Sequence, residues 1–270
     1  MLQLENICVS YPGGITALHP TSISFQRGQF TVLLGPSGAG KSTLLRCLNL
    51  LNKPSSGYIT AEGLGRLDTP NSLLRHRRRT AMIFQQHQLI DRHTALQNVL
   101  VGRLGYHGSL RTMFPFGSKE CLMALESLER VGLLHKALER VDNLSGGEQQ
   151  RVGIARALVQ KPEIILADEP VASLDPVTAQ KVISLLYTIC KEDRISAIVS
   201  LHQVHLAKDY ADRIVGLANG RVIFDQSPKE LTSSILDEIY RDKDREAYGD
   251  LHPEEATPKS IRPDLAAAEN

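Results

Sequence analysis

Four groups of residues suited to binding or cleaving phosphate occur along this 270-residue chain. A glycine-rich segment that ends in Lys-Ser-Thr comes first, and a Ser-Gly-Gly turn follows it. An Asp-Glu pair and then a single histidine each close a short apolar run. The groups are residues 35–43, residues 144–151, residues 164–170 and His202. The first group by itself predicts that the chain binds a nucleoside triphosphate.

The glycine-rich segment matches the pattern G-x-x-x-x-G-K-[ST] and lies between a predicted strand over 30–34 and a predicted helix over 41–51. Its glycines let successive backbone N–H groups turn toward phosphate oxygens, and the helix N-terminus adds partial positive charge. We expect Lys41 to reach the β- and γ-phosphates of ATP and the Ser42 hydroxyl to bind Mg²⁺. The residues expected to hold the nucleotide are Gly35, Pro36, Ser37, Gly38, Ala39, Gly40, Lys41, Ser42 and Thr43.

The acidic pair Asp168 and Glu169 closes a predicted strand. The last residues of a parallel strand lie at the carboxyl edge of the sheet, which is also the edge that carries the phosphate segment. Asp168 is suited to hold Mg²⁺, and Glu169 is suited to polarise the attacking water as a general base. Two solvated carboxylates at a strand end are the alternative, and the phosphate segment upstream favours the functional interpretation.

Ser145 and Glu148 fit a capping box at the start of a helix predicted over 145–161. Gly146 and Gly147 are poor residues for a first helical turn, because each costs about 1 kcal/mol relative to alanine. Bare backbone is explained there if an anion approaches closely, while an ordinary helix start is the alternative. Two phosphate sites in one chain, far apart in sequence, indicate that they face different nucleotides across a two-fold dimer.

The elements that position these groups follow an α/β pattern. Apolar runs over 163–168 and 195–201 are typical of strands buried on both faces of a mainly parallel sheet, with a helix between them. Residues 86–160 are predicted to be mostly helical. Asn219-Gly220 predicts a two-residue hairpin, and Ser227-Pro228-Lys229-Glu230 predicts the start of another helix.

Composition excludes several other classes of protein. The net charge of +1 indicates no partner such as nucleic acid or an anionic membrane, and we interpret the basic run 75–79 as a solvated face. The four cysteines are scattered, which favours reduced thiols over disulfides or a zinc site. No apolar run approaches the ~18 residues that span a bilayer. No secretory signal is visible, so any membrane role is expected to come through a partner.

The phrase Leu-Ser-Gly-Gly-x-Gln over 144–149, together with the other groups, resembles the nucleotide-binding subunit of an ATP-binding-cassette (ABC) transporter. The resemblance covers about residues 1–230 and implies a P-loop NTPase (RecA-like) core with a mainly parallel sheet, an antiparallel β subdomain and an α-helical signature subdomain. It implies an ATP-binding domain over 1–240, with the helical subdomain inserted at about 86–160. A poorly ordered tail is expected over 241–270, where charged residues and prolines accumulate. Glu148 departs from the glutamine of many members.

The same resemblance assigns roles to single residues. Residues 35–43 resemble the Walker A loop, and Asp168 and Glu169 resemble the magnesium-site aspartate and the catalytic glutamate. Tyr11 stands where an aromatic ring stacks on adenine, with an ordinary strand aromatic as the alternative. Gln85 resembles the glutamine that senses Mg²⁺ and the attacking water, and neighbouring Gln86 is the other candidate.

Three roles concern the γ-phosphate and the dimer. His202 resembles the switch histidine that contacts the γ-phosphate. Asp175 resembles the aspartate of the loop that communicates across the dimer, and it also fits a helix N-cap before Pro176. The residues that resemble the segment contacting the γ-phosphate of the opposite protomer's ATP are Ser145, Gly146, Gly147 and Gln149.

Within the family, the strongest resemblance is to phosphonate importer ATPases. The phrases that carry it are residues 83–86, 98–105, 167–176, 201–204 and 210–215. Phosphite (or hypophosphite) importers are the alternative, because no residue of this chain should touch the transported solute. A soluble ABC ATPase that acts on the ribosome or DNA is a more distant alternative.

The resemblance also implies cofactors, partners and a location. The cofactors are ATP and Mg²⁺. The partners are a second copy of the chain, transmembrane permease subunits and, indirectly, a periplasmic solute-binding protein, with no nucleic acid. The location is the cytoplasmic face of the inner membrane, where the chain is a peripheral subunit.

Overall fold

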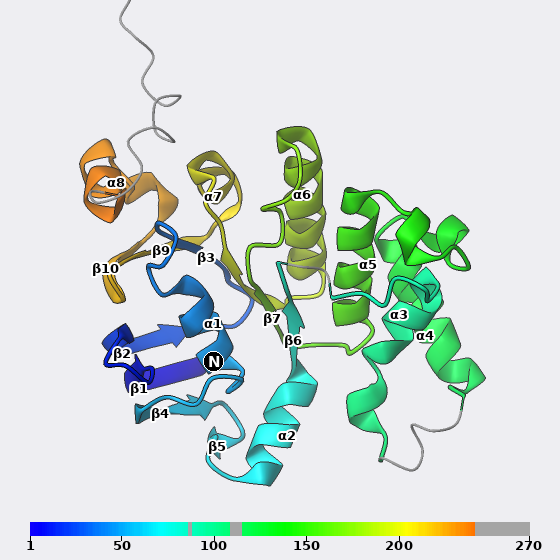
Figure 1. Cartoon of the computed structure of the whole chain (residues 1–270), viewed down its shortest axis with the longest axis horizontal. Coiled ribbons are helices and arrows are strands. Elements are labelled where there is room, and N and C mark those ends of the chain that lie inside the picture. The colour runs from blue at the N-terminus through cyan, green and yellow to red at the C-terminus, as the bar shows by residue number, and fades with distance from the viewer. Residues whose placement is uncertain (86–87, 109–114, 241–270) are drawn as a thin grey trace, which may run out of the picture.

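The computed structural model describes residues 1–85, 88–108 and 115–240, and the strands of these residues form two sheets (Figure 1). The larger sheet has the order β10-β9-β3-β8-β7-β6 and is parallel except for the β9–β10 hairpin. Its strands are β3 (Phe30–Leu34), β6 (Thr80–Ile83), β7 (Ile164–Ala167), β8 (Ser196–Ser200), β9 (Arg213–Ala218) and β10 (Arg221–Gln226). The smaller, antiparallel sheet has the order β2-β1-β4-β5, and its strands are β1 (Leu2–Ser10), β2 (Thr16–Phe25), β4 (Ser56–Ala61) and β5 (Gly65–Arg66).

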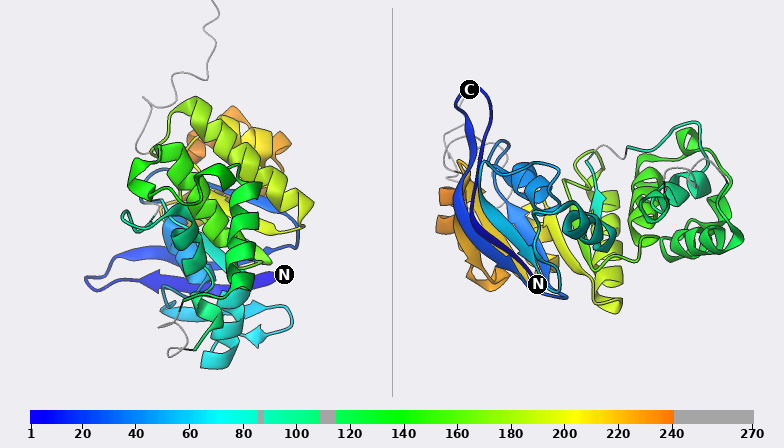
Figure 2. Two further views of the ribbon diagram at one scale, coloured as in Figure 1. Left: turned by 90° about the vertical axis from the view of Figure 1, so that its right-hand side faces the viewer. Right: turned by 90° about the horizontal axis from the view of Figure 1, so that it is seen from below.

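Three helices pack on one another beyond the edge strand β6 and form one end of the molecule (Figures 1 and 2). These are α3 (Ala95–Val101), α4 (Ser118–Arg130) and α5 (Gly146–Leu158). The other helices are α1 (Lys41–Leu48), α2 (Pro70–Arg79), α6 (Pro176–Glu192), α7 (Val204–Tyr210) and α8 (Ser233–Tyr240). Short 3₁₀ turns occur at η1 (Leu104–Tyr106), η3 (Leu134–Lys136), η4 (Val141–Asn143) and η5 (Pro228–Glu230). No helix of the described ranges is both long and apolar enough to cross a bilayer.

The apolar strands of the larger sheet supply two separate cores, one on each face. Side chains alternate between the faces of a strand, so neighbouring residues enter different cores. Leu33 and Leu166 pack with α1 and the smaller sheet. Val32 and Ile165 pack on the opposite face, where α6 and α7 contribute to the core. The prediction of an α/β fold with a mainly parallel sheet and an antiparallel β subdomain is confirmed, and α1 lies between the two sheets.

The predicted helix at Ser227 is wrong beyond its first turn. Pro228–Glu230 form only the 3₁₀ turn η5, and the Ser227 side chain accepts no capping hydrogen bond from the backbone. The helix α8 begins later, at Ser233. Leu231 is buried in the core after η5, so packing of this side chain competes with continuation of the helix. The hairpin predicted at Asn219-Gly220 is confirmed, with Ala218 opposite Arg221 and both turn residues at positive φ.

The basic run 75–79 is a solvated face only in part. It lies in α2, whose helix the sequence analysis missed; Arg75 and Arg77 are exposed, but His76 is buried, and both His76 and Arg77 contact backbone carbonyl groups. His76 Nε2 lies 2.8 Å from the Leu48 carbonyl oxygen, and Arg77 donates to the Asn49 and Leu50 carbonyl oxygens at 3.2 and 2.8 Å. These carbonyls lie at the end of α1, where the Arg77 guanidinium complements the helix dipole. The run therefore attaches α2 to the end of the phosphate-segment helix.

Acidification should destabilise the protein through His76. This residue is buried, and burial together with the charges of Arg77 and Arg79 lowers its pKa below the usual 6.5, although the bond to Leu48 acts in the opposite direction. Just below pH 6.5 this histidine therefore binds a proton in the unfolded chain but stays neutral in the folded protein. The free energy of unfolding is retained above pH 6.5 and falls as the pH drops below it. Urea unfolding at pH 7.5 and 5.5 measures this loss. His76→Gln should reduce the difference between the two pH values, whereas the same change at exposed His135 should leave it intact.

Candidate nucleotide-binding site

The phosphate segment runs from the end of β3 into α1 and is packed directly against both sheets. Gly35 and Gly40 have φ values of +153° and +100°. A Cβ atom at Gly35 would lie 2.2 Å from the Leu217 carbonyl oxygen of β9, and one at Gly40 would lie 2.7 Å from the Ala17 carbonyl oxygen of β2. Only glycine fits these two positions. No side chain caps the first turn of α1, so its backbone N–H groups can bind an anion.

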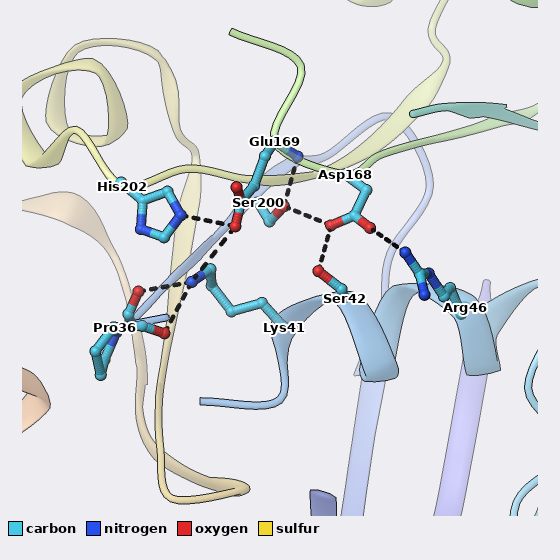
Figure 3. A network of polar contacts seen from close by, with 9 residues as sticks. Pro36, Lys41, Ser42, Arg46, Asp168, Glu169, Ser200 and His202 are labelled. Atoms are coloured by element: carbon cyan, nitrogen blue, oxygen red, sulfur yellow. Dashed lines mark hydrogen bonds and ion pairs between the residues drawn. The ribbon is translucent and has the colours of Figure 1, made fainter. Parts of the chain in front are cut away.

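Lys41 points back into the phosphate segment. Its Nζ atom donates to the carbonyl oxygens of Gly35 and Pro36 at 2.7 and 3.1 Å and lies 4.0 Å from Glu169 Oε1 (Figure 3). The side chain is buried, and burial lowers the pKa of Lys41, while the charges of Glu169 and Asp168 partly oppose that shift. A cation held by loop carbonyls and carboxylates in this place is suited to bind the terminal phosphates of ATP.

Asp168 follows β7 and is surrounded by hydrogen-bond donors. Ser42 Oγ donates to Asp168 Oδ1 at 2.7 Å and Ser200 Oγ donates to the same oxygen at 3.2 Å, while Arg46 lies 3.5 Å from Oδ2 (Figure 3). The structure therefore brings the hydroxyl predicted to bind Mg²⁺ next to the predicted carboxylate. A hydroxyl and a carboxylate beside a triphosphate site are the oxygen ligands that Mg²⁺ prefers, so these residues fit the ion.

Glu169 and His202 form the second polar pair of the site. His202 Nε2 lies 2.7 Å from Glu169 Oε1. This hydrogen bond, together with the charges of His202 and Lys41, lowers the pKa of Glu169, while burial acts against it. Glu169 is therefore a carboxylate at neutral pH, as a general base must be. Its backbone has φ of +48°, which is uncommon for a residue with a side chain.

The structure places Gln85 at the margin of this cluster. β6 ends where the Asp168 N–H donates to the Ile83 carbonyl oxygen at 2.8 Å, so Gln85 follows at the same sheet edge. The Gln85 side chain is exposed, and within the described ranges no hydrogen bond joins it to the cluster. Gln86 lies outside the described residues. Tyr11, which follows β1, is 43% exposed, and its hydroxyl accepts a hydrogen bond from Asn52, while no described hydrogen bond joins it to the cluster.

The Ser-Gly-Gly turn begins α5, as the capping box predicts. The Glu148 N–H donates to Ser145 Oγ at 3.4 Å, and Glu148 Oε2 accepts from the Ser145 N–H at 2.9 Å. Lys136 lies 2.8 Å from Glu148, and this contact together with the Ser145 hydrogen bonds lowers the pKa of Glu148 to about 2. Gln149 donates to the Val141 and Leu144 carbonyl oxygens, so its side chain binds the segment that precedes the turn. Within the described residues no hydrogen bond or ion pair joins this turn to the cluster around Lys41.

Gly147 has a packing role that the sequence analysis missed. A Cβ atom there would lie 2.5 Å from Thr178 Cγ2 of α6, whereas one at Gly146 would make ordinary contact with Leu174 at 3.5 Å. Asp175 caps α6 by accepting from the Thr178 N–H at 3.0 Å, as its N-cap interpretation predicts. The starts of α5 and α6 therefore lie side by side, and a side chain at position 147 would have to displace Thr178.

Gly147→Ala should lower turnover by about 10-fold or more, because relieving the clash moves α5 relative to α6. Adding Thr178→Ser removes the obstructing methyl group, keeps the hydroxyl, and should restore most of the activity. Steady-state ATP hydrolysis by the single and double variants measures the effect. Gly146→Ala is the matched change, since its methyl fits within this chain. A double variant as inactive as the single one would instead assign Gly147 to contact with an anion.

Sequence reasoning missed two residues of the cluster. Arg46 could have been found, because residues four apart on a helix share a face and Arg46 lies four residues after Ser42. Ser200 carries no such signal, since it is one small polar residue at the end of an apolar strand. Only the pairing of β8 with β7 brings Ser200 to the acidic pair.

Known proteins resemble the chain in sequence. The family described as ABC transporter matches residues 18–172. The phosphonates import ATP-binding protein PhnC 3 of Nostoc sp. is 59% identical over 251 residues, which cover 93% of this chain and 96% of that protein. The phosphite import ATP-binding protein PxtA of Stutzerimonas stutzeri is 61% identical over 240 residues, which cover 89% of this chain and 87% of that protein.

Solved structures resemble the chain in fold. The ADP conformation of MJ1267, an ATP-binding cassette of an ABC transporter, has a TM-score of 0.78 and 28% identity, and the match covers 90% of this chain and 99% of that one. A dimeric, post-hydrolysis structure of the ATP-binding cassette MJ0796 with ADP and phosphate has a TM-score of 0.74 and 34% identity. That match covers 86% of this chain and all of that one.

Proposed function

Because the chain belongs to the ABC transporter family of ATP-binding proteins, we propose that it is the ATP-hydrolysing subunit of an importer for phosphonates. The proposal of ATP hydrolysis is supported chiefly by one observation, which is that five polar side chains lie together at one edge of the sheet. These residues are Lys41, Ser42, Asp168, Glu169 and His202. The choice of phosphonate rests on relatives with that function in their names. Phosphite is the second candidate solute, because a phosphite import protein is 61% identical.

In the proposed reaction, each residue of the cluster has one task. Lys41 and the N–H groups of the phosphate segment hold the terminal phosphates, and Ser42 and Asp168 would hold Mg²⁺, which neutralises phosphate charge when bound. Glu169 accepts a proton from the attacking water, and His202 keeps the carboxylate in place. We assign Gln85 to contact with the water and Tyr11 to stacking on adenine.

The second half of the pocket is proposed to come from another copy of the chain. The α5 tip carries N–H groups and a hydroxyl suited to an anion, yet no described hydrogen bond or ion pair joins it to the Lys41 cluster in its own chain. Two copies arranged head to tail would place the tip of each on the ATP of the other. ATP then stabilises the closed dimer, since it contacts both copies only in that state. A dimeric solved relative of similar fold supports this arrangement.

We propose that a groove between the sheet and the end helices receives a permease helix. Its volume is about 420 Å³. Leu51 and Leu74 line it and are 48% and 47% exposed, so they give the groove an apolar surface that a partner helix can cover. Arg77 and Arg78 also line it, and no acidic residue does so among the lining residues of the described ranges. A helix with apolar and acidic side chains matches this surface.

The solute is tested by ATPase assays of the subunit reconstituted with its permease in membranes. The solute-binding protein is added after loading with a phosphonate, phosphite or phosphate. Phosphonate-loaded protein should stimulate hydrolysis most. Stimulation only by the phosphite-loaded protein would replace the proposed solute with the second candidate, and stimulation by neither would contradict import of both.

A further inference from the structure

Ser200 contacts both acidic residues of the site although it cannot itself touch solvent. It is the last residue of β8 and is 0% exposed. Its hydroxyl oxygen accepts the Glu169 N–H at 2.8 Å, and its proton goes to Asp168 Oδ1 at 3.2 Å (Figure 3). The hydroxyl therefore accepts one hydrogen bond and donates its only proton to the other.

The bond to Glu169 is made at an unusual backbone conformation. Glu169 has φ of +48°, and a residue with a side chain keeps such a conformation only where its surroundings hold it there. The Glu169 backbone has two described hydrogen bonds: its N–H donates to Ser200 Oγ at 2.8 Å, and its carbonyl oxygen accepts from the Ala172 N–H at 3.3 Å. His202, two residues after β8, holds the carboxylate at 2.7 Å. Ser200 therefore acts on the backbone of Glu169, while His202 acts on its side chain.

We infer that Ser200 is a positioning residue for ATP hydrolysis, which fixes the direction of the Glu169 side chain and the orientation of the Asp168 carboxylate. The inference rests on the proposed roles of these two acids. Asp168 keeps Ser42 and Arg46 as partners when Ser200 is changed, whereas the Glu169 N–H has no other described hydrogen-bond partner. Loss of the hydroxyl should therefore reduce the rate of hydrolysis more than the binding of ATP.

Ser200→Ala in the full-length chain tests this, with Ser196→Ala as a matched control. Ser196 lies at the other end of the same strand, is 7% exposed, and its hydroxyl accepts the Gly28 N–H at 3.0 Å. Each variant loses a hydrogen bond to a backbone N–H, and Ser200→Ala also loses the bond to Asp168, so its Tm is expected to fall at least as far as that of Ser196→Ala. Only Ser200→Ala should lower kcat, by about 10- to 100-fold, because small displacements of reacting groups have effects of that size. Its KM for ATP should change less than about 3-fold, because Lys41 and the phosphate segment are untouched.

Two further variants separate positioning from folding. Ser200→Thr keeps the hydroxyl and should stay within about 5-fold of the wild-type kcat, whereas Ser200→Cys keeps a side chain of similar shape with a weak hydrogen-bonding atom and should fall between wild type and alanine. A Ser200→Ala or Ser200→Cys protein with wild-type kcat would overturn the inference. An increase in KM as large as the decrease in kcat would overturn it too. A wild-type chain without ATPase activity would instead overturn the proposed function.

Discussion

Glu169→Gln should reduce ATP turnover by about 10²- to 10⁴-fold while ATP binding stays within a few-fold of the wild type. Glutamine matches the shape of glutamate and can still bond to His202, but it cannot accept a proton from water. The expectation follows from a carboxylate whose pKa is lowered, chiefly by the hydrogen bond from His202, and which lies 4.0 Å from Lys41. Phosphate release under saturating ATP measures turnover, and equilibrium binding of a fluorescent ATP analogue measures affinity.

The same variant should accumulate as an ATP-bound dimer, since the closed state persists when hydrolysis cannot proceed. Size-exclusion chromatography with and without ATP measures this change in mass. Glu163→Gln is the matched control, because Glu163 directly precedes β7 just as the acidic pair follows it, and its partners are Arg79 at 3.5 Å and Arg27 at 4.0 Å. Near-normal turnover in Glu169→Gln would remove Glu169 from the role of general base. A variant that stays monomeric with ATP bound would contradict the shared pocket.

Ser145→Asp should abolish turnover, whereas Ser145→Asn should retain part of it. Serine, asparagine and aspartate are equally good N-caps, so both variants can cap α5. They differ by one negative charge, placed where the γ-phosphate of the opposite protomer's ATP is proposed to lie and also beside Glu148 Oε2, which accepts from the Ser145 hydroxyl at 2.8 Å. If Ser145 were only a helix cap, the two variants would differ in activity only as far as they differ in Tm.

Repulsion between this carboxylate and phosphate should also prevent dimer formation. The measurement is ATP-dependent dimerisation with each change made in the Glu169→Gln background, alongside turnover in the wild-type background. Circular dichroism and Tm check that α5 is intact, which matters because the nearby Glu148 carboxylate is already held by Ser145 and Lys136. Equal dimerisation of the Asp and Asn variants would contradict an anion at this helix tip.

Much of the site can be predicted from sequence because local chemistry decides it. The phosphate segment needs glycines at positive φ, and Gly35 and Gly40 have it. The capping box at Ser145 and the N-cap at Asp175 depend on contacts only three residues apart, and both occur. The hairpin at residues 219–220 depends on two residues that accept positive φ. In each case the pattern and the contact that it predicts lie within one turn of chain.

The interpretations that were wrong or absent concern contacts between distant segments. The basic run 75–79 has the composition of a solvated face, but the end of α1 supplies carbonyl groups for His76 and Arg77. Gly147 was explained by an approaching anion, while its nearest obstacle is Thr178 of the neighbouring helix. Neither partner can be inferred from composition near the residue, because each lies about 28 to 31 positions away along the chain.

By itself, the sequence determined that this chain has a glycine-rich loop that leads into a helix, an acidic pair at a strand end and a capped helix start with two glycines, because turn geometry and helix capping depend on adjacent residues. The strand order β3-β8-β7, which only the tertiary structure shows, decided that Ser200 and His202 reach Glu169 and that Arg46 reaches Asp168. Parallel strands joined by long crossovers place side chains from remote segments at one edge, and no local pattern specifies which segments become neighbours.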